Sequence, residues 1–587
     1  MAVPLHPYAR RAGARLRAVL PDRATLATMG RSPRKDLFAG LTVAIVALPL
    51  ALGFGVASGA GAEAGLATAV VAGALAAFFG GSNLQVSGPT GAMTVVLVPI
   101  VHRYGTTAVL TVGLMSGVLL IAAALGGAGR FMAYVPAPVV EGFTVGIAGV
   151  IGLQQVPAAL GVPASGAPNV VVAAADAVVD FARTPHPAAL ALAAAVAAAM
   201  LIGARLRPGI PFSLLAVVAA TVVTGLAGLD VATIGHLPAG LPAPSLGFLH
   251  PGELPHLATA ALAVAALAAL ESLMSATAAD AMSVSERHDS DRELFGQGIA
   301  NLVAPLFGGV AATGAIARTA VNVRSGAASR LAALVHAAVL AVVVFAAAPL
   351  VAGIPLAALA GVLIATAVRM VEVASLRALA RSGRGEAAVL VLTAGATLAF
   401  DLVTAVLVGL LVAGALALRQ VARSAALTRV PLHEGLPPAD HHAEEQALLA
   451  EHIVAYRIDG PLFFAGAHRF LLELAETTDV KAVILRLSRV STIDATGALV
   501  LGDAIAKLER RGILVLVSGV RADHLRTLDA LGVLDALRAD GRVFPGTPGA
   551  IAHARHHLNG LPAATAGPAT RAAGAGPRTE QRAPTRE

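Results

Sequence analysis

The sequence predicts an α-helical protein that crosses a membrane many times and continues into a small soluble α/β domain. The chain of 587 residues is 57% apolar and only 13% charged, whereas ordinary soluble domains carry about 25% charge. Its mean hydropathy is +0.77. Apolar runs follow one another from Leu37 to Leu418, and after about residue 430 the composition becomes that of a soluble domain.

The apolar region divides into segments of roughly the length that a bilayer requires. One crossing takes about 20 apolar residues, so the region holds roughly twelve to fourteen crossings. Breaks at Gly, Pro and charged residues divide it into fourteen segments, seven in each half. We expect these spans near residues 37–58, 65–79, 90–101, 107–125, 139–160, 188–202, 212–226, 257–282, 294–306, 314–323, 331–351, 356–367, 387–400 and 402–418.

Basic residues are distributed as expected for an internal N-terminus and an even number of spans. Residues 1–36 are basic and lack a cleavable signal pattern, so we expect a cytoplasmic arm. The predicted outer loops contain no Lys or Arg, apart from His102-Arg103 and Arg183 at the ends of spans, whereas arginines recur in the predicted inner loops. This bias accounts for the net charge of +7, and we expect no nucleic-acid partner.

The soluble part alternates strand-like and helical patterns. Strand-like runs at 453–458, 482–487 and 513–518 alternate with helical patterns at 468–476, 497–510 and 522–528, which predicts a small α/β domain over residues 452–558. The transmembrane region is placed at 37–420, with a linker at 421–451. The tail 559–587 is rich in Ala, Gly, Pro, Thr and Arg, and we expect it to be disordered.

Two apolar runs are interrupted in the same way, one in each half. Gly-Gly precedes Thr-Gly-Ala in both, as Thr90-Gly91-Ala92 in the first and Thr313-Gly314-Ala315 in the second. Interrupted segments at corresponding places in two halves indicate a transporter's substrate site. The free N–H groups and positive dipole ends of two broken helices would attract an anion. We hypothesise that this pair of breaks binds an anion.

Several motifs, in order along the chain, resemble the SulP (sulfate permease) family of anion transporters. They are the first-span run Ala47 to Gly55, Val86 to Ala92, Arg287 to Leu294, and Thr313 to Gly326, and the turn Ser491 to Gly497 is similar to that of a STAS domain. The resemblance covers roughly residues 35–555. It implies two inverted seven-span repeats, a core domain that moves against a gate domain, a homodimer, and secondary-active anion uptake coupled to sodium or protons.

Arg318 is the cation expected at the anion site. It lies about one turn into the second interrupted segment, and a charge inside a membrane segment marks function by default. The alternatives are a structural ion pair and a side chain that snorkels to the cytoplasmic face. Phe54 matches a family position beside the anion, although simple packing is the alternative for it. The expected substrate-binding residues are Phe54, Thr90, Gly91, Ala92, Gly314, Ala315, Ile316, Ala317 and Arg318.

Glu271 and Ser275 are the expected coupling-ion residues. Glu271 is the lone carboxylate in residues 257–279, and Ser275 lies one turn later on the same face. Oxygen ligands of this kind suit a hard cation such as Na⁺, and the resemblance places the family's coupling carboxylate at Glu271. The alternative is a neutral glutamic acid hydrogen-bonded between helices. Apart from Na⁺ as a coupling ion, no cofactor is expected.

Only the family pattern narrows the choice of substrate. Sulfate comes first by family majority, and dicarboxylates come third. Bicarbonate comes second, because Leu50 stands where many relatives carry Gln and the surrounding pattern is closer to the bicarbonate-transporting branch. Two hypotheses from other classes stay open: a permease for an organic substrate such as a dicarboxylate or nucleobase, which the same fold would allow, and a membrane anchor for a signalling domain.

For the other polar residues, helix capping is weighed against a functional role. Thr496, next to Asp494 at the STAS turn, is a candidate regulatory phosphorylation site, and a helix N-cap is the alternative. His288, Asp289 and Asp291 are too tightly spaced for a helical metal site, so we expect capping and no bound metal.

The remaining expectations concern chemistry and location. With no cysteine, no Walker loop and no convincing nucleophile–base pair, we expect neither an enzyme nor an ATP-driven pump. The expected location is a bacterial cytoplasmic (inner) membrane, crossed many times, with both termini and the STAS domain in the cytoplasm.

Overall fold

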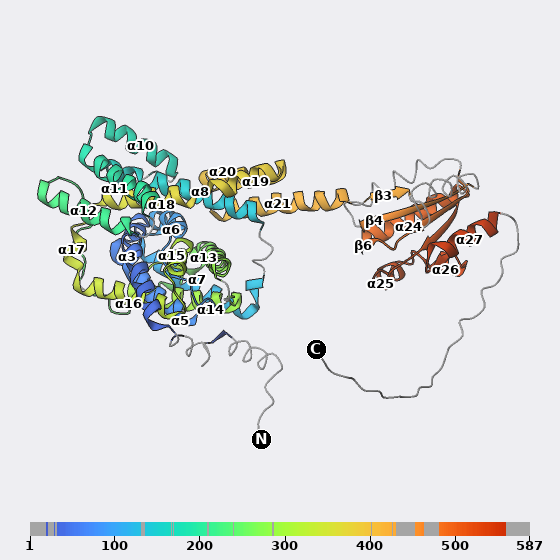
Figure 1. Cartoon of the computed structure of the whole chain (residues 1–587), viewed down its shortest axis with the longest axis horizontal. Helices are drawn as coiled ribbons and strands as arrows, with labels where there is room; N and C mark the ends of the chain where they lie inside the picture. The colour runs from blue at the N-terminus through green and yellow to red at the C-terminus, as the bar shows by residue number, and fades with distance from the viewer. Residues whose placement is uncertain are drawn as a thin grey trace, which may run out of the picture. The chain divides into compact units, whose positions relative to one another are not determined.

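The structure is a computed structural model. It describes residues 19–20, 29, 32–130, 136–165, 167, 169–207, 210–238, 240–283, 287–400, 402–424, 426–429, 452–462 and 480–558. The chain divides into two compact units, Met1–Ala413 and Gly414–Glu587 (Figure 1). The predicted tail, and the predicted helical pattern at 468–476, lie outside the described residues.

The first half of the helical unit contains long apolar helices and one interrupted segment. Its elements are α3 (Pro33–Ala57), α4 (Ala62–Ala67), the π-helix η1 (Thr68–Ala72), α5 (Gly73–Phe79), β1 (Ser87–Gly88), α6 (Gly91–Tyr104), α7 (Thr106–Gly126), α8 (Ala137–Gln154), α9 (Val156–Leu160), α10 (Val170–Arg183), α11 (Pro187–Leu206) and α12 (Phe212–Ala227).

The second half repeats this pattern of helices around a second interruption. Its elements are the 3₁₀ turn η3 (Pro251–Glu253), α13 (Leu254–Met282), α14 (Ser290–Val303), η4 (Ala304–Phe307), β2 (Thr313–Gly314), α15 (Ile316–Arg324), α16 (Leu331–Ala346), α17 (Ala348–Ala352), α18 (Leu356–Met370), α19 (Val373–Ser382), α20 (Arg384–Ala399) and α21 (Leu402–Ser424). Every one of the fourteen predicted segments contains a helix, whereas α10 and α19 were not expected.

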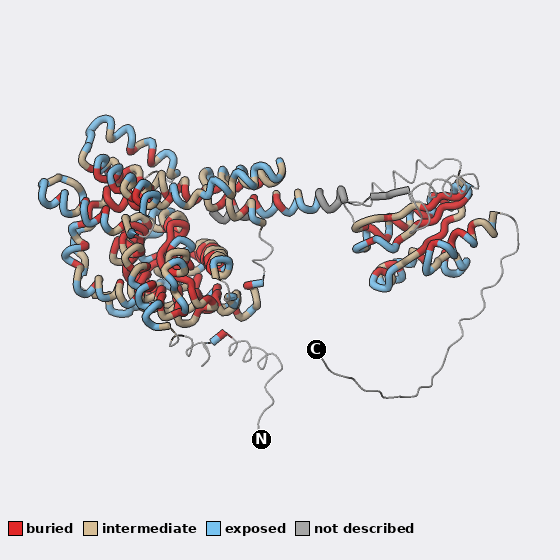
Figure 2. The backbone as a smooth tube through the Cα atoms, viewed as in Figure 1, coloured by how far each residue is buried: buried red, intermediate tan, exposed pale blue. Residues whose placement is uncertain are grey.

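Membrane-crossing helices are identified by length and apolar composition. Among the described residues, seven helices satisfy both criteria, and four shorter apolar helices accompany them. The total of fourteen crossings therefore stays a prediction. The helices pack in two groups: α7 lies against α13 and α14, while α18 lies against α8 and α11, and α3 contacts both α16 and α18. The buried stretches of both groups appear in Figure 2.

The second unit is an α/β domain around a mostly parallel sheet. Its strand order is β3 (Ala426–Arg429), β4 (Ile453–Leu462), β5 (Ala482–Arg486), β7 (Leu514–Ser518) and β8 (Val543–Phe544), with β6 (Val490–Ile493) paired to β4. Among the strand pairs that the structure describes in this unit, β3–β4 is antiparallel and the others are parallel. The helices are α24 (Ala495–Arg510), α25 (Ala522–Ala530), α26 (Asp535–Ala539) and α27 (Thr547–Leu558).

Helices cover both faces of this sheet because its strands alternate apolar side chains between them. On β5, Val483 and Leu485 join the core with α24, whereas Ile484 joins the core with α27. The three predicted strands and the predicted helices at 497–510 and 522–528 are confirmed as β4, β5, β7, α24 and α25.

Candidate functional site

The two interrupted segments meet as a two-residue antiparallel ladder inside the helical unit. Ser87 in β1 pairs with Gly314 in β2, and Gly88 pairs with Thr313. Because the strands run in opposite directions, β1 leads into α6 at one end of the ladder and β2 leads into α15 at the other. The N-termini of two helices therefore face each other across the ladder, which is the arrangement that the repeated Thr-Gly-Ala pattern predicted.

One helix, α14, holds both extended segments through a buried polar stripe. Glu293, Gln297 and Asn301 lie at i, i+4 and i+8 and are each at most 2% exposed. Asn301 accepts the N–H of Ala312 at 2.7 Å and donates to its carbonyl at 2.9 Å. Gln297 Nε2 donates to Ser87 Oγ at 2.6 Å. The stripe thus satisfies backbone that a membrane interior would otherwise leave unpaired.

The carboxylate of Glu293 caps the start of the first break. Its Oε2 accepts the N–H groups of Gly81 and Ser82 at 2.9 and 3.1 Å. Its Oε1 accepts the amides of Gln85 and Gln297, both at 2.9 Å. Four N–H donors compensate the burial of this carboxylate. This stripe was not predicted, although its i, i+4, i+8 spacing in an otherwise apolar region is visible in the sequence.

Each break is also held by side chains from the other half of the chain. In the first half, Thr68 Oγ1 accepts the N–H of Val310 at 2.7 Å and lies 3.1 Å from its carbonyl oxygen. In the second half, Asn322 Nδ2 donates to the carbonyl of Leu84 at 2.8 Å. The two halves therefore build one site together.

Helix α13 connects both breaks with three neighbouring polar side chains. Thr90 Oγ1 donates to Glu271 Oε2 at 2.8 Å, which joins α13 to the first break. Ser272 Oγ accepts the N–H of Gly314 at 3.0 Å, which joins it to the second. The hydroxyl of Ser275 lies 3.0 Å from Thr319 Oγ1 in α15. Ser272, which was not predicted, thus binds the ladder's backbone, whereas the predicted Ser275 contacts a side chain of α15.

Arg318 lies in α15, and its side chain reaches the first break. Its side chain is 2% exposed, and its Nη2 donates to the carbonyl of Pro89 at 2.6 Å. Within the described residues, it makes no ion pair and its Nη1 has no hydrogen-bond partner. Gly88 has a φ of +150°, which L side chains rarely adopt, and an added Cβ would lie 2.7 Å from Nη1, so a substitution there would be strained. Neither the ion-pair nor the snorkelling alternative describes this side chain.

The remaining predicted substrate residues surround the two helix N-termini. Thr90 caps α6 and accepts the N–H of Met93, and Ala315 is the N-cap residue of α15. Phe54 is buried, and its Cε1 lies 3.2 Å from where a Cβ of Gly91 would be. Ala92 is fully buried, whereas Ile316 and Ala317 are exposed at the start of α15. The structure brings all of these residues to the ends of the ladder.

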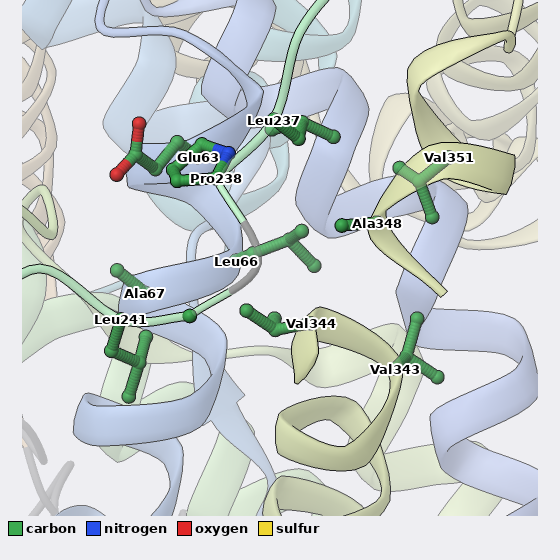
Figure 3. Close-up of a pocket in the computed structure, with 11 residues that line it drawn as sticks. Glu63, Leu66, Ala67, Leu237, Pro238, Leu241, Val343, Val344, Ala348 and Val351 are labelled. Carbon is green, nitrogen blue, oxygen red and sulfur yellow. The ribbon is translucent and has the colours of Figure 1, made fainter. Parts of the chain in front are cut away.

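The lining of a separate pocket contains none of the predicted site residues (Figure 3). The pocket is lined by aliphatic side chains of α4, α16 and α17 and by Leu237, Pro238 and Leu241, together with Glu63. Figure 3 shows the carboxylate of Glu63 pointing away from the aliphatic side chains. With a single charged group directed outward, this pocket has no feature that would bind an inorganic anion.

Among the polar residues for which helix capping was considered, Asp289 and Asp494 are N-caps, whereas Thr496 is not. Asp289 is the N-cap of α14 and accepts the N–H of Arg292 at 3.0 Å. In the second unit, Asp494 is the N-cap of α24 and accepts the N–H of Gly497 at 2.6 Å. Thr496 is exposed on the first turn of α24. The cap at this turn is thus provided by Asp494, which leaves the hydroxyl of Thr496 accessible.

Comparison with known proteins agrees with this architecture. The sulfate permease family model matches residues 34–393, and the STAS domain model matches residues 446–547. The chain is 35% identical over 511 residues to YvdB of Bacillus subtilis, named as a candidate sulfate transporter, covering 85% of this chain and 94% of that protein. It is 32% identical over 526 residues to the bicarbonate transporter BicA of Synechocystis, covering 86% and 91%.

Solved structures share the fold. The transmembrane domain of a cyanobacterial bicarbonate transporter, BicA, is 34% identical and superposes with a TM-score of 0.58 over 65% of this chain and 98% of that one. The murine anion transporter Slc26a9 is 17% identical and superposes with a TM-score of 0.79 over 94% and 96%, which shows a common fold. From these matches and the geometry above, the chain belongs to the sulfate permease family and carries a STAS domain after its membrane transporter unit.

Proposed function

We propose that this protein moves a small inorganic oxyanion across the bacterial cytoplasmic membrane by secondary-active transport, with sulfate as the first candidate. The observation that carries the proposal is the pair of helix N-termini facing each other across the β1–β2 ladder. Helix N-termini attract anions through free N–H groups and the helix dipole. The free Nη1 of Arg318, among the described residues, adds a donor to the same place.

Coupling is proposed to occur at Glu271, by sodium or by protons. The carboxylate is partly exposed and receives a hydrogen bond from Thr90, the residue that caps α6. Glu271 and Arg318 bind neighbouring residues of the first break, because Arg318 Nη2 donates to the carbonyl of Pro89. A cation bound at Glu271 would therefore lower the repulsion that an anion meets beside a carboxylate. Anion and cation binding would support each other across the first turn of α6.

We propose that the helical unit opens this site alternately to the two sides of the membrane. The helices that hold the ladder, α13 and α14, pack with α7, whereas α18 packs with α8 and α11. We assign the first group to the core domain and the second to the gate domain, and we propose that two copies of the chain form a homodimer. The STAS domain and both termini are proposed to lie in the cytoplasm.

Bicarbonate is the second candidate, and Leu50 is the observation that favours it. This side chain is 6% exposed on α3, one turn before Phe54. A leucine offers no hydrogen bond to an oxyanion, so a tetrahedral sulfate would lose a contact that planar bicarbonate does not need. Leu50→Gln should then raise sulfate uptake relative to bicarbonate uptake.

Radiolabelled uptake in proteoliposomes tests the proposal. The experiment compares sulfate and bicarbonate under an imposed sodium or proton gradient for wild type, Glu271→Gln and Glu253→Gln. Glu253 is an exposed carboxylate just before the same helix, so its variant is the matched control. Gradient-driven uptake of one anion that is lost only in Glu271→Gln supports the proposal. If the inserted protein moves neither anion, the proposal is wrong.

A further inference from the structure

We infer that α19 (Val373–Ser382) is a binding surface for anionic phospholipid headgroups. This helix was not expected from hydropathy, because it lies between the apolar helices α18 and α20 and is itself rich in arginine (Figure 1). With ten residues it is about 15 Å long, which is too short to cross a bilayer. None of its residues is buried, and Figure 2 shows this stretch as exposed or intermediate.

The helix has two different faces. Arg377 and Arg381 are one turn apart and both exposed, and they form a basic stripe. Leu376 and Leu379 are half-buried on the other side, where α19 packs with α20 and α8. A helix with a basic face and an apolar face is typical of segments at the membrane–water boundary.

The basic stripe continues beyond α19. Arg369 in the last turn of α18 and Arg384 at the start of α20 are also exposed. Within the part of the chain that the structure describes, none of these four arginines makes an ion pair with a carboxylate. Four unpaired guanidinium groups on consecutive short segments match the phosphates of anionic lipids, and guanidinium binds phosphate in a bidentate manner. The bias of basic residues in the chain puts this stripe on the cytoplasmic side, where anionic lipids attract them.

A hydrogen bond fixes α19 to the transporter unit. Ser375 Oγ donates to Glu141 Oε1 of α8 at 2.8 Å. The arginine face is therefore held at a defined position on the helical unit and does not depend on lipid to form. This predicts a saturable lipid site in the purified full-length protein.

The test uses the absence of cysteine in the chain. Ala380→Cys, at an exposed position of α19, accepts an environment-sensitive fluorophore, and the labelled full-length protein is titrated in detergent with short-chain phosphatidylglycerol or phosphatidylcholine. We expect saturable binding of phosphatidylglycerol only, weakened by salt. Arg377→Gln with Arg381→Gln should weaken it by about fivefold per arginine, or about 25-fold together.

The matched control is Arg205→Gln with Arg207→Gln. These two arginines are exposed at the end of α11, on the same predicted side, but they are not part of the α19 stripe. Equal weakening by the control pair would overturn the inference, and so would equal binding of phosphatidylcholine or no binding at all.

Discussion

Replacing Thr68 by valine should destabilise the protein because it removes the partner of a buried backbone group. Thr68 is 0% exposed, and its Oγ1 accepts the N–H of Val310 at 2.7 Å. Valine has nearly the same shape but no acceptor, so the N–H of Val310 is left unpaired inside the helical unit. An unsatisfied buried donor costs about 1–3 kcal/mol. We expect Thr68→Val to lower the free energy of unfolding by that amount.

Thr393→Val is the control for this prediction. Thr393 is also 0% exposed, but its hydroxyl donates only to the carbonyl of Val389, one turn earlier in α20. Such back-bonding contributes little to helix stability, so this substitution should be close to neutral. Unfolding in a detergent titration, followed by circular dichroism, measures both variants. Equal losses for Thr68→Val and Thr393→Val would refute the reasoning that the second break depends on Thr68.

Three further predictions concern the ladder and the STAS domain. Gly91→Ala should raise the KM for the anion, because the new Cβ would lie 3.1 Å from Ile151 Cγ1 and 3.2 Å from Phe54 Cε1. The control is Gly395→Ala, whose new Cβ meets nothing within 4 Å and which should leave uptake unchanged. Equal KM values for the two variants would contradict this prediction. Asp494→Ala should destabilise the STAS domain by about 1 kcal/mol through loss of the cap, whereas Thr496→Ala should not, as chemical denaturation can measure. Burial, followed by His557, His556 and Arg542, lowers the pKa of His553. The unfolded chain therefore binds the proton more readily below about pH 6.5, and the stability of the STAS domain should fall with falling pH. Thermal melting at several pH values measures this dependence, and His553→Gln should flatten it. An unchanged pH dependence would argue against the lowered pKa.

The sequence predicted the elements that depend on local pattern. Apolar runs located the helices, and short strand-like runs between helical patterns located β4, β5 and β7. The repeated Thr-Gly-Ala pattern located both breaks, because glycine and proline mark irregular backbone even in an apolar region. Glu271 was predicted separately, as the lone carboxylate of its span, and the structure joins it to Thr90 of the first break.

The side-chain partners could not be predicted because they depend on contacts between distant segments. Ser275 and Ser272 are three residues apart on α13, and sequence spacing cannot say which hydroxyl reaches a backbone group in β2. Gln297 binds Ser87 across a separation of 210 residues, and no local rule connects the two. The exposed helix α19 was missed for a different reason, because its arginines lowered the hydropathy on which the segments were chosen.

The reciprocal hold on the two breaks has a consequence for how the protein is made. Leu84 and Asn322 are 238 residues apart, and Thr68 and Val310 are 242 residues apart. At about 5–20 residues per second, the ribosome needs roughly 10–50 seconds to synthesise the partner of the first break after the break itself. During that time the first half is in the membrane with the backbone of its extended segment unpaired by the second half. Insertion of the nascent chain must therefore shelter this segment, in the translocation machinery or with bound water, until the second half arrives.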